Sequence, residues 1–146
     1  MQTDIKEKIT EKLINMSFEI KAVVLYGSYA RKTHEEDSDI DILIVSDQVN
    51  PKRHRRGKEI TIIKGSIALR LPLDILLLTS TECLLNFRNC NLLFLDIAWE
   101  GIVLLDEDDF LKGLIEEAKE YISERGIKKF DDGWIFPVQE RVPVLL

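Results

Sequence analysis

Hydrophobic positions follow two different spacings along this chain, one helical and one extended. Over residues 3–18, apolar side chains recur every three or four positions, which predicts an amphipathic helix. The short apolar runs 20–26 and 39–45 are typical of buried strands, and residues 28–32 between them fit a short helix. The beginning of the chain therefore mixes helices with strands that can share one sheet.

The rest of the chain repeats this mixture. Thr79-Ser80-Thr81-Glu82 is a capping-box pattern, which predicts a helix start, and Gly126 is typical of a helix end. Interleaved elements predict one α/β domain over residues 1–146, with a mixed sheet flanked by helices and a C-terminal helix and hairpin. The further predicted elements are a helix over 59–71, a strand over 73–79, a helical stretch over 80–99 with a break near 89–91, a strand over 102–105, a helix that stops at Gly126 and a hairpin over 127–138.

Composition narrows the class of protein. Of the 146 residues, 45% are hydrophobic and 32% are charged, which fits a soluble globular domain. The net charge of −6 argues against a general nucleic-acid binder, so we expect contact with nucleic acid only through a partner. The charged N-terminus lacks a signal core, and no apolar run approaches the roughly 18 residues of a membrane span. We therefore expect a cytoplasmic protein without membrane contact.

Two acidic residues begin the second predicted strand and follow a Gly-Ser turn. Gly27 and Ser28 come directly after the first strand, ten residues separate Ser28 from Asp39, and Asp41 lies two positions further. Side chains two apart in a strand share a face, so the two carboxylates would lie side by side and favour a hard cation such as Mg²⁺. The turn offers backbone N–H groups to phosphate. Either feature alone fits an ordinary turn or a solvated strand end, but together they favour a nucleotide and metal site.

The third predicted strand contains a single charged residue, Asp74, in an otherwise apolar run. Catalysis by two metal ions requires several carboxylates around one point. If this strand pairs beside the second one, Asp74 would lie next to Asp39 and Asp41. The alternative is a strand-end residue exposed to water. We favour the functional interpretation because the neighbouring Asp-x-Asp strand supplies the other carboxylates.

Basic residues in two places could contact phosphate. Arg31 follows the Gly-Ser turn and could bind a phosphate or pair with Glu35 or Glu36. The basic run 52–56 could contact a triphosphate, an RNA or an acidic partner, although a solvated loop is the favoured interpretation.

The spacing of Gly27-Ser28 and Asp39-Ile40-Asp41 resembles the signature of the DNA polymerase beta-like nucleotidyltransferase superfamily. The resemblance is strongest to the minimal nucleotidyltransferases, short prokaryotic proteins that are often paired with a HEPN-domain toxin. It covers residues 23–45, and Asp74 stands where that family places its third carboxylate. One residue departs from the pattern, because many relatives carry glycine where this chain has Lys32.

This resemblance implies an active site and a partner. Asp39 and Asp41 would hold two Mg²⁺ ions, and Asp74 would complete the catalytic metal site. Gly27 and Ser28 would bind the phosphates of ATP. AMP would pass to a hydroxyl group of a HEPN-domain partner, for which this chain would be the antitoxin.

Two other functions remain open from the sequence. The chain could be a non-catalytic nucleotide-binding module that neutralises its partner by contact. It could also transfer a nucleotide to a small molecule or to an RNA end, for which the basic run 52–56 is the support.

Overall fold

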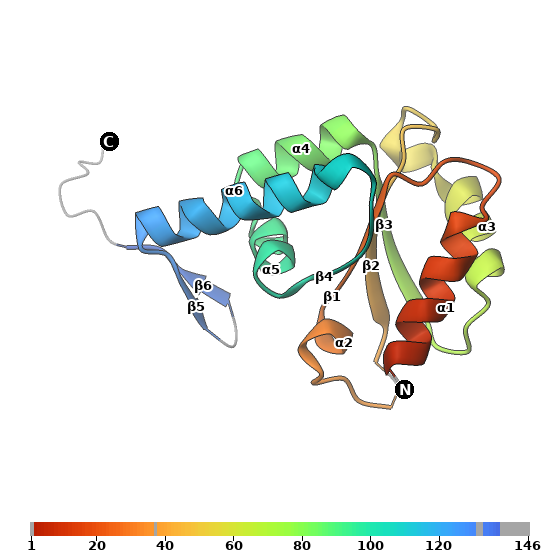
Figure 1. Cartoon of the computed structure of the whole chain (residues 1–146), viewed down its shortest axis with the longest axis horizontal. Coiled ribbons are helices and arrows are strands. Elements are labelled where there is room, and N and C mark those ends of the chain that lie inside the picture. The colour runs from red at the N-terminus through yellow and green to blue at the C-terminus, as the bar shows by residue number, and fades with distance from the viewer. Residues whose placement is uncertain (1, 37, 131–132, 138–146) are drawn as a thin grey trace.

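The computed structural model describes residues 2–36, 38–130 and 133–137, in which helices and strands alternate (Figure 1). In these ranges no helix has both the length and the apolar character needed to cross a membrane. The elements in chain order are α1 (Gln2–Ile14), β1 (Ala22–Tyr26), α2 (Ser28–Arg31), β2 (Ile40–Val45), η1 (Arg53–Arg55), α3 (Gly57–Ile67), β3 (Leu73–Leu78), α4 (Ser80–Arg88), α5 (Leu92–Glu100), β4 (Ile102–Asp106), η2 (Glu107–Asp109), α6 (Phe110–Arg125), β5 (Lys128–Phe130) and β6 (Gly133–Ile135).

Four strands form one mixed sheet in the order β3-β2-β1-β4. β1 runs antiparallel to its neighbours β2 and β4, whereas β2 and β3 run parallel. Parallel neighbours need a crossover connection, which α3 provides. The predicted mixed sheet is therefore confirmed. Its topology places the end of β1 and the starts of β2 and β3 at the same edge.

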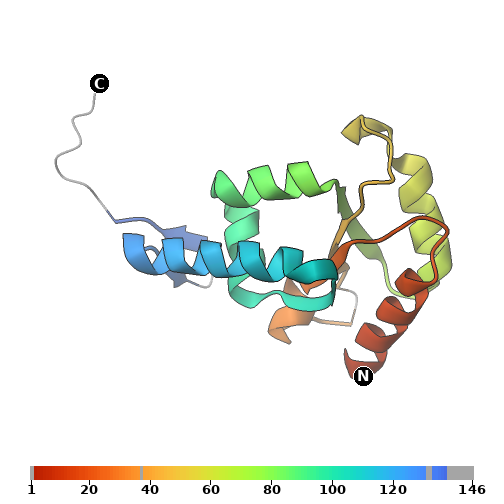
Figure 2. The same cartoon turned by 45° about the horizontal axis from the view of Figure 1, so that its top comes forward.

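Helices cover both faces of this sheet (Figure 1). α1 and α3 pack on the face that carries Val23 and Leu25, and α4, α5 and α6 pack on the face that carries Ala22 and Val24. Figure 2 shows the same two helix layers from a second direction. A strand that is buried on both faces must be apolar at nearly every position, which explains the continuous apolar runs of β1 and β2.

Several predicted elements have different ends in the structure. The helix expected over 3–18 ends at Ile14, because the chain must turn back there to enter β1. The helix expected over 59–71 ends at Ile67 and is followed by Ala68 in the left-handed conformation. The capping box at Thr79, the break between α4 and α5 and the stop at Gly126 are confirmed.

The predicted C-terminal hairpin is present as β5 and β6. Its turn residues 131–132, and residue 138 at its predicted end, lie outside the described residues. Asp96 of α5 holds the hairpin, since its Oδ1 accepts hydrogen bonds from Lys129 Nζ at 2.7 Å and Trp134 Nε1 at 2.8 Å. In Figure 1 the hairpin projects from the helical layer, away from the sheet.

Candidate active site

Two of the predicted carboxylates face each other across neighbouring strands. Asp41 of β2 is paired in the parallel ladder with Asp74 of β3. Neighbouring strands lie about 5 Å apart, so the two side chains are within reach of each other. Asp41 shares a sheet face with Leu43, and this face is the one covered by α4, α5 and α6.

The pKa of Asp41 is raised from 3.8 to about 6. Burial is the largest cause, followed by the negative charges of Asp74 and Asp39, whereas Arg31 lowers the pKa. Burial and like charges both disfavour the ionised form of a carboxyl group. Above the raised pKa, the pair therefore carries repelling charges that a cation would neutralise.

Asp39 lies just before β2 and is exposed, whereas Asp41 is half-buried. The charge of Asp39 is near enough to raise the Asp41 pKa. In the described part of the chain, however, no three His, Cys, Asp or Glu side chains are arranged so that they could hold one metal ion together. The donors still fit a hard divalent cation, because all are carboxylate oxygens and the two facing carboxylates repel each other. Asp39, Asp41 and Asp74 are thus the residues that could hold Mg²⁺.

Gly27 directly follows β1 in a backbone conformation that suits glycine, with φ of 76° and ψ of −156°. A Cβ at this position would overlap the carboxylate of Asp41, so the turn passes directly against the acidic pair. The carbonyl of Gly27 accepts hydrogen bonds from the N–H groups of Ala30 and Arg31, both at 3.1 Å. These bonds form the short helix α2, which begins at Ser28 directly after Gly27.

Lys32 ends α2 in the left-handed conformation, with φ of 64°. Its backbone N–H donates to the carbonyl of Ser28, which closes the helix. A side chain in this conformation costs roughly 1 kcal/mol relative to glycine. The turn therefore adopts the conformation that glycine favours, although this chain has lysine there.

Arg31 pairs with Glu100, the last residue of α5, rather than with Glu35 or Glu36. The distance between Arg31 Nη1 and Glu100 Oε1 is 2.7 Å. Glu100 lies 69 residues further along the chain, which is why no local pattern indicated this pair. The structure thus links the turn that begins at Gly27 to the helix layer.

Tyr26 is a site residue that sequence reasoning missed. It is the last residue of β1 and pairs with Asp41 in the antiparallel ladder. Its side chain is buried, and burial together with the charges of Asp41 and Asp74 raises its pKa. The neutral phenol can donate a hydrogen bond beside the carboxylates. Its position before Gly27 was a signal in the sequence, but only the strand register shows which face the ring occupies.

The basic run 52–56 divides into two parts. Arg56 is 1% exposed, and its guanidinium donates to the carboxylate of Glu82 and to three backbone carbonyls. The other four residues are exposed, as predicted, but Arg53–Arg55 form the short helix η1 rather than a loop. The run follows β2 at the end opposite to Asp41 (Figure 1), so it does not border the acidic pair.

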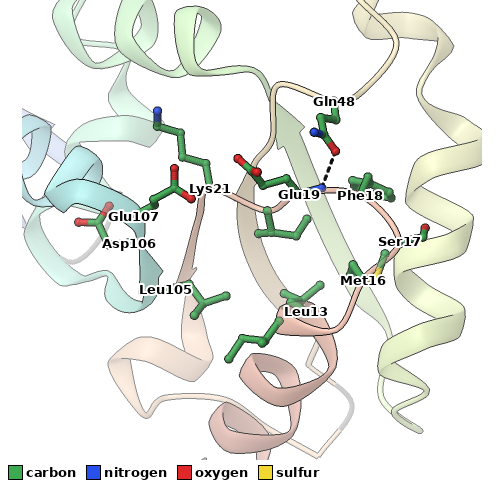
Figure 3. A pocket seen from close by; sticks show the side chains of 12 residues that line it. Leu13, Met16, Ser17, Phe18, Glu19, Lys21, Gln48, Leu105, Asp106 and Glu107 are labelled. Carbon is green, nitrogen blue, oxygen red and sulfur yellow. Dashed lines mark hydrogen bonds between the residues drawn. The ribbon is translucent and has the colours of Figure 1, made fainter.

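A cavity of about 560 Å³ lies at the opposite end of the sheet from the carboxylates. Figure 3 shows its lining, which includes Lys21 before β1, Gln48 after β2 and Asp106 of β4. Gln48 accepts a hydrogen bond from the backbone of Glu19, and Asp106 accepts two from the first turn of α6. These side chains hold the fold together, and the cavity is separate from the candidate active site.

The chain is similar in sequence to known proteins. The family described as the nucleotidyltransferase domain matches residues 5–123. A protein of Methanocaldococcus jannaschii, provisionally named a protein adenylyltransferase, is 28% identical over 117 residues, which are 80% of this chain and 75% of that protein. A second protein of this organism with the same provisional name is 38% identical over 50 residues, or 33% of this chain and 50% of that protein.

The chain is also similar to solved structures. A toxin–antitoxin crystal structure with AMP-PNP has a TM-score of 0.50 and 19% identity, and the match covers 83% of this chain and 92% of that chain. A tri-AMPylated HEPN toxin in complex with an MNT antitoxin from Shewanella oneidensis has a TM-score of 0.45 and 19% identity, with 86% and 93% covered. The family match spans most of this sequence and includes the acidic pair and the Gly27 turn. This chain belongs to the nucleotidyltransferase domain family.

Proposed function

We propose that this chain transfers AMP from ATP to a hydroxyl group of a partner protein, in a Mg²⁺-dependent reaction that silences a HEPN-domain toxin. The observation that carries the proposal is the facing pair Asp41 and Asp74, directly against the turn at Gly27. Carboxylates for a divalent cation and a glycine turn for phosphates are the two requirements of this chemistry.

The proposed roles follow from position. Asp39, Asp41 and Asp74 would hold two Mg²⁺ ions, which would supply charge neutralisation at the phosphates. Gly27 and Ser28 would bind the β- and γ-phosphates through backbone N–H groups. The acceptor oxygen would form a bond to the α-phosphorus as the bond to pyrophosphate breaks, and Asp74 would take the hydroxyl proton.

The relatives support a protein acceptor. The provisional name of the M. jannaschii proteins is protein adenylyltransferase, and one solved neighbour is a toxin–antitoxin with an ATP analogue. The resemblance to minimal nucleotidyltransferases adds the HEPN domain as the partner. The exposed basic run 52–55 gives an RNA acceptor little support, because it lies at the end of β2 away from Asp41.

The direct test is transfer of label from α-labelled ATP to the HEPN-domain protein that we expect in the neighbouring gene. Label should appear on that protein with Mg²⁺, and both EDTA and Asp41→Asn should abolish it. Asp47→Asn is the matched control, since this exposed carboxylate follows the opposite end of β2. Transfer that survives Asp41→Asn would contradict the proposal.

A second candidate function is neutralisation by contact without catalysis. The observation that favours it is that, within residues 2–36, 38–130 and 133–137, the acidic side chains are not arranged around one point. The double variant Asp39→Asn/Asp41→Asn separates the two functions in a toxicity assay. It should lose neutralisation if adenylylation is required and keep it if contact is sufficient, with circular dichroism as the check of folding.

A further inference from the structure

An ion pair connects the phosphate turn to the end of α5. Arg31 Nη1 donates to Glu100 Oε1 at 2.7 Å. The Arg31 side chain is 43% exposed, whereas that of Glu100 is 13% exposed. The carboxylate is thus the sheltered partner, and the guanidinium is held at the edge of the turn.

The backbone near Glu100 is fixed by tight packing. Gly101, the next residue, has no room for a side chain, because a Cβ would collide with the carbonyl of Ile97 and with the side chain of Val24 in β1. The N–H of Gly101 donates to the same Ile97 carbonyl at 2.9 Å. The end of α5 is therefore pressed against β1, the strand that leads into the phosphate turn.

The guanidinium keeps binding capacity beyond this pair. Arginine has five N–H donors, and within the described residues the bond to Glu100 is the one hydrogen bond of the Arg31 guanidinium. Arg31 and Glu100 also line a cavity of about 570 Å³ together with Trp99 and Lys129. The guanidinium thus borders space that a ligand can enter.

We propose that Glu100 is a positioning residue that holds the Arg31 guanidinium ready for a nucleotide phosphate. This inference rests on the proposed function. An unrestrained arginine loses considerable side-chain entropy when it binds a ligand, and an anchored one has already lost it. Glu100 therefore acts through Arg31 and does not touch the nucleotide.

A different role for Glu100 predicts the opposite effect. If its negative charge mainly neutralised Arg31, removing it would strengthen phosphate binding. Two substitutions distinguish these roles. Glu100→Gln removes the charge but keeps an oxygen that can accept from Arg31, whereas Glu100→Ala removes the acceptor itself.

The experiment measures binding of Mg²⁺–AMP-PNP to the full chain by isothermal titration calorimetry. Glu100→Ala should raise Kd roughly five- to tenfold, the size expected when one pre-organised charged contact becomes mobile. Glu100→Gln should stay within about twofold of the unmutated chain. Glu117→Ala is the matched control, because it breaks the exposed pair between Arg88 and Glu117 at 3.2 Å. It should leave Kd unchanged.

A double-mutant cycle tests whether Glu100 acts through Arg31. In an Arg31→Ala background, Glu100→Ala should have no further effect on Kd, whereas a general loss of structure would weaken binding again. An unchanged or lower Kd for Glu100→Ala, or an equal loss in both backgrounds, would overturn this inference alone. Absence of binding by the unmutated chain would instead contradict the proposed function and with it this inference.

Discussion

At the scale of single residues, the candidate site depends on groups held in unfavourable states. Asp41 is half-buried opposite another carboxylate, Gly27 has a backbone conformation that few other residues adopt, and Lys32 is left-handed. Such features persist only where the surrounding fold compensates for them, and they gather at functional sites. The charge repulsion at Asp41 and the backbone strain at Lys32 should therefore be measurable as changes in the free energy of unfolding.

Asp41→Asn should stabilise the metal-free protein at neutral and alkaline pH. The folded pKa of about 6 lies above the ordinary value of 3.8, so the folded state binds the proton more tightly. Stability is therefore lost as the pH rises through this window. The variant should gain about 1 kcal/mol above the window, after allowance for solvent screening, and nothing below it. Urea denaturation in EDTA, below and above this pH window, measures the stability of the variant relative to the unmutated protein. An equal gain on both sides of the window would show that the gain does not come from the ionisation of Asp41.

Lys32→Gly should raise the free energy of unfolding by about 1 kcal/mol, because glycine adopts φ near 64° without the Cβ clash. Lys64→Gly is the matched control, since Lys64 is exposed within the last turn of α3. There the same change should cost about 1 kcal/mol. Thermal denaturation of both variants checks the opposite signs. Destabilisation by Lys32→Gly would show that contacts of the lysine side chain stabilise the fold by more than the relief of backbone strain does.

At the scale of elements, periodicity predicted the identity of helices and strands better than their ends. The capping box at Thr79 and the glycine stop at Gly126 are local signals, and the structure has both. The end of α1 depends on where the chain must enter β1, which no local signal contains. The burial of Arg56 depends on α4, whose Glu82 lies 26 residues further along the chain. Within a run of basic residues, nothing local distinguished it from its exposed neighbours.

The ion pair of Arg56 with Glu82 should make stability sensitive to acid. Arg56 holds the pKa of Glu82 below its usual value of 4.5. The stabilisation is therefore complete above that value and is lost as the pH falls through the lower folded pKa. Glu82→Gln should cost about 2 kcal/mol at neutral pH, and much less in acid. Urea denaturation from neutral to acidic pH measures how the difference in unfolding free energy between Glu82→Gln and the unmutated protein shrinks. Glu120 lies on the exposed face of α6, so the plot of unfolding free energy against pH for Glu120→Gln should run parallel to that of the unmutated protein. A parallel plot for Glu82→Gln would contradict the role given to the ion pair.

At the scale of the whole molecule, the strand order creates the site. The end of β1 and the starts of β2 and β3 meet at one edge of the sheet, which brings the glycine turn and the acidic pair together. The helix layer contacts this edge through the ion pair of Glu100 with Arg31. The site is thus a property of three strands and one helix rather than of a single motif.

Mg²⁺ at millimolar concentration should raise the melting temperature of the whole protein. A ligand that binds only the folded state stabilises it by mass action, and here it would also relieve the repulsion at Asp41. The Asp39→Asn/Asp41→Asn variant should show no such rise in a thermal denaturation experiment with and without Mg²⁺. A rise of equal size in this variant would mean that the cation binds elsewhere.

The sequence by itself determined which segments are helices and strands and which acidic residues begin β2 and interrupt β3, because these properties depend on spacing over a few residues. Only the tertiary structure decided that Asp74 lies opposite Asp41, that Tyr26 joins them, and that Arg31 pairs with Glu100. These contacts depend on strand order, register and helix packing. Such long-range relations arise when distant segments bury their apolar faces together, and no local pattern carries them.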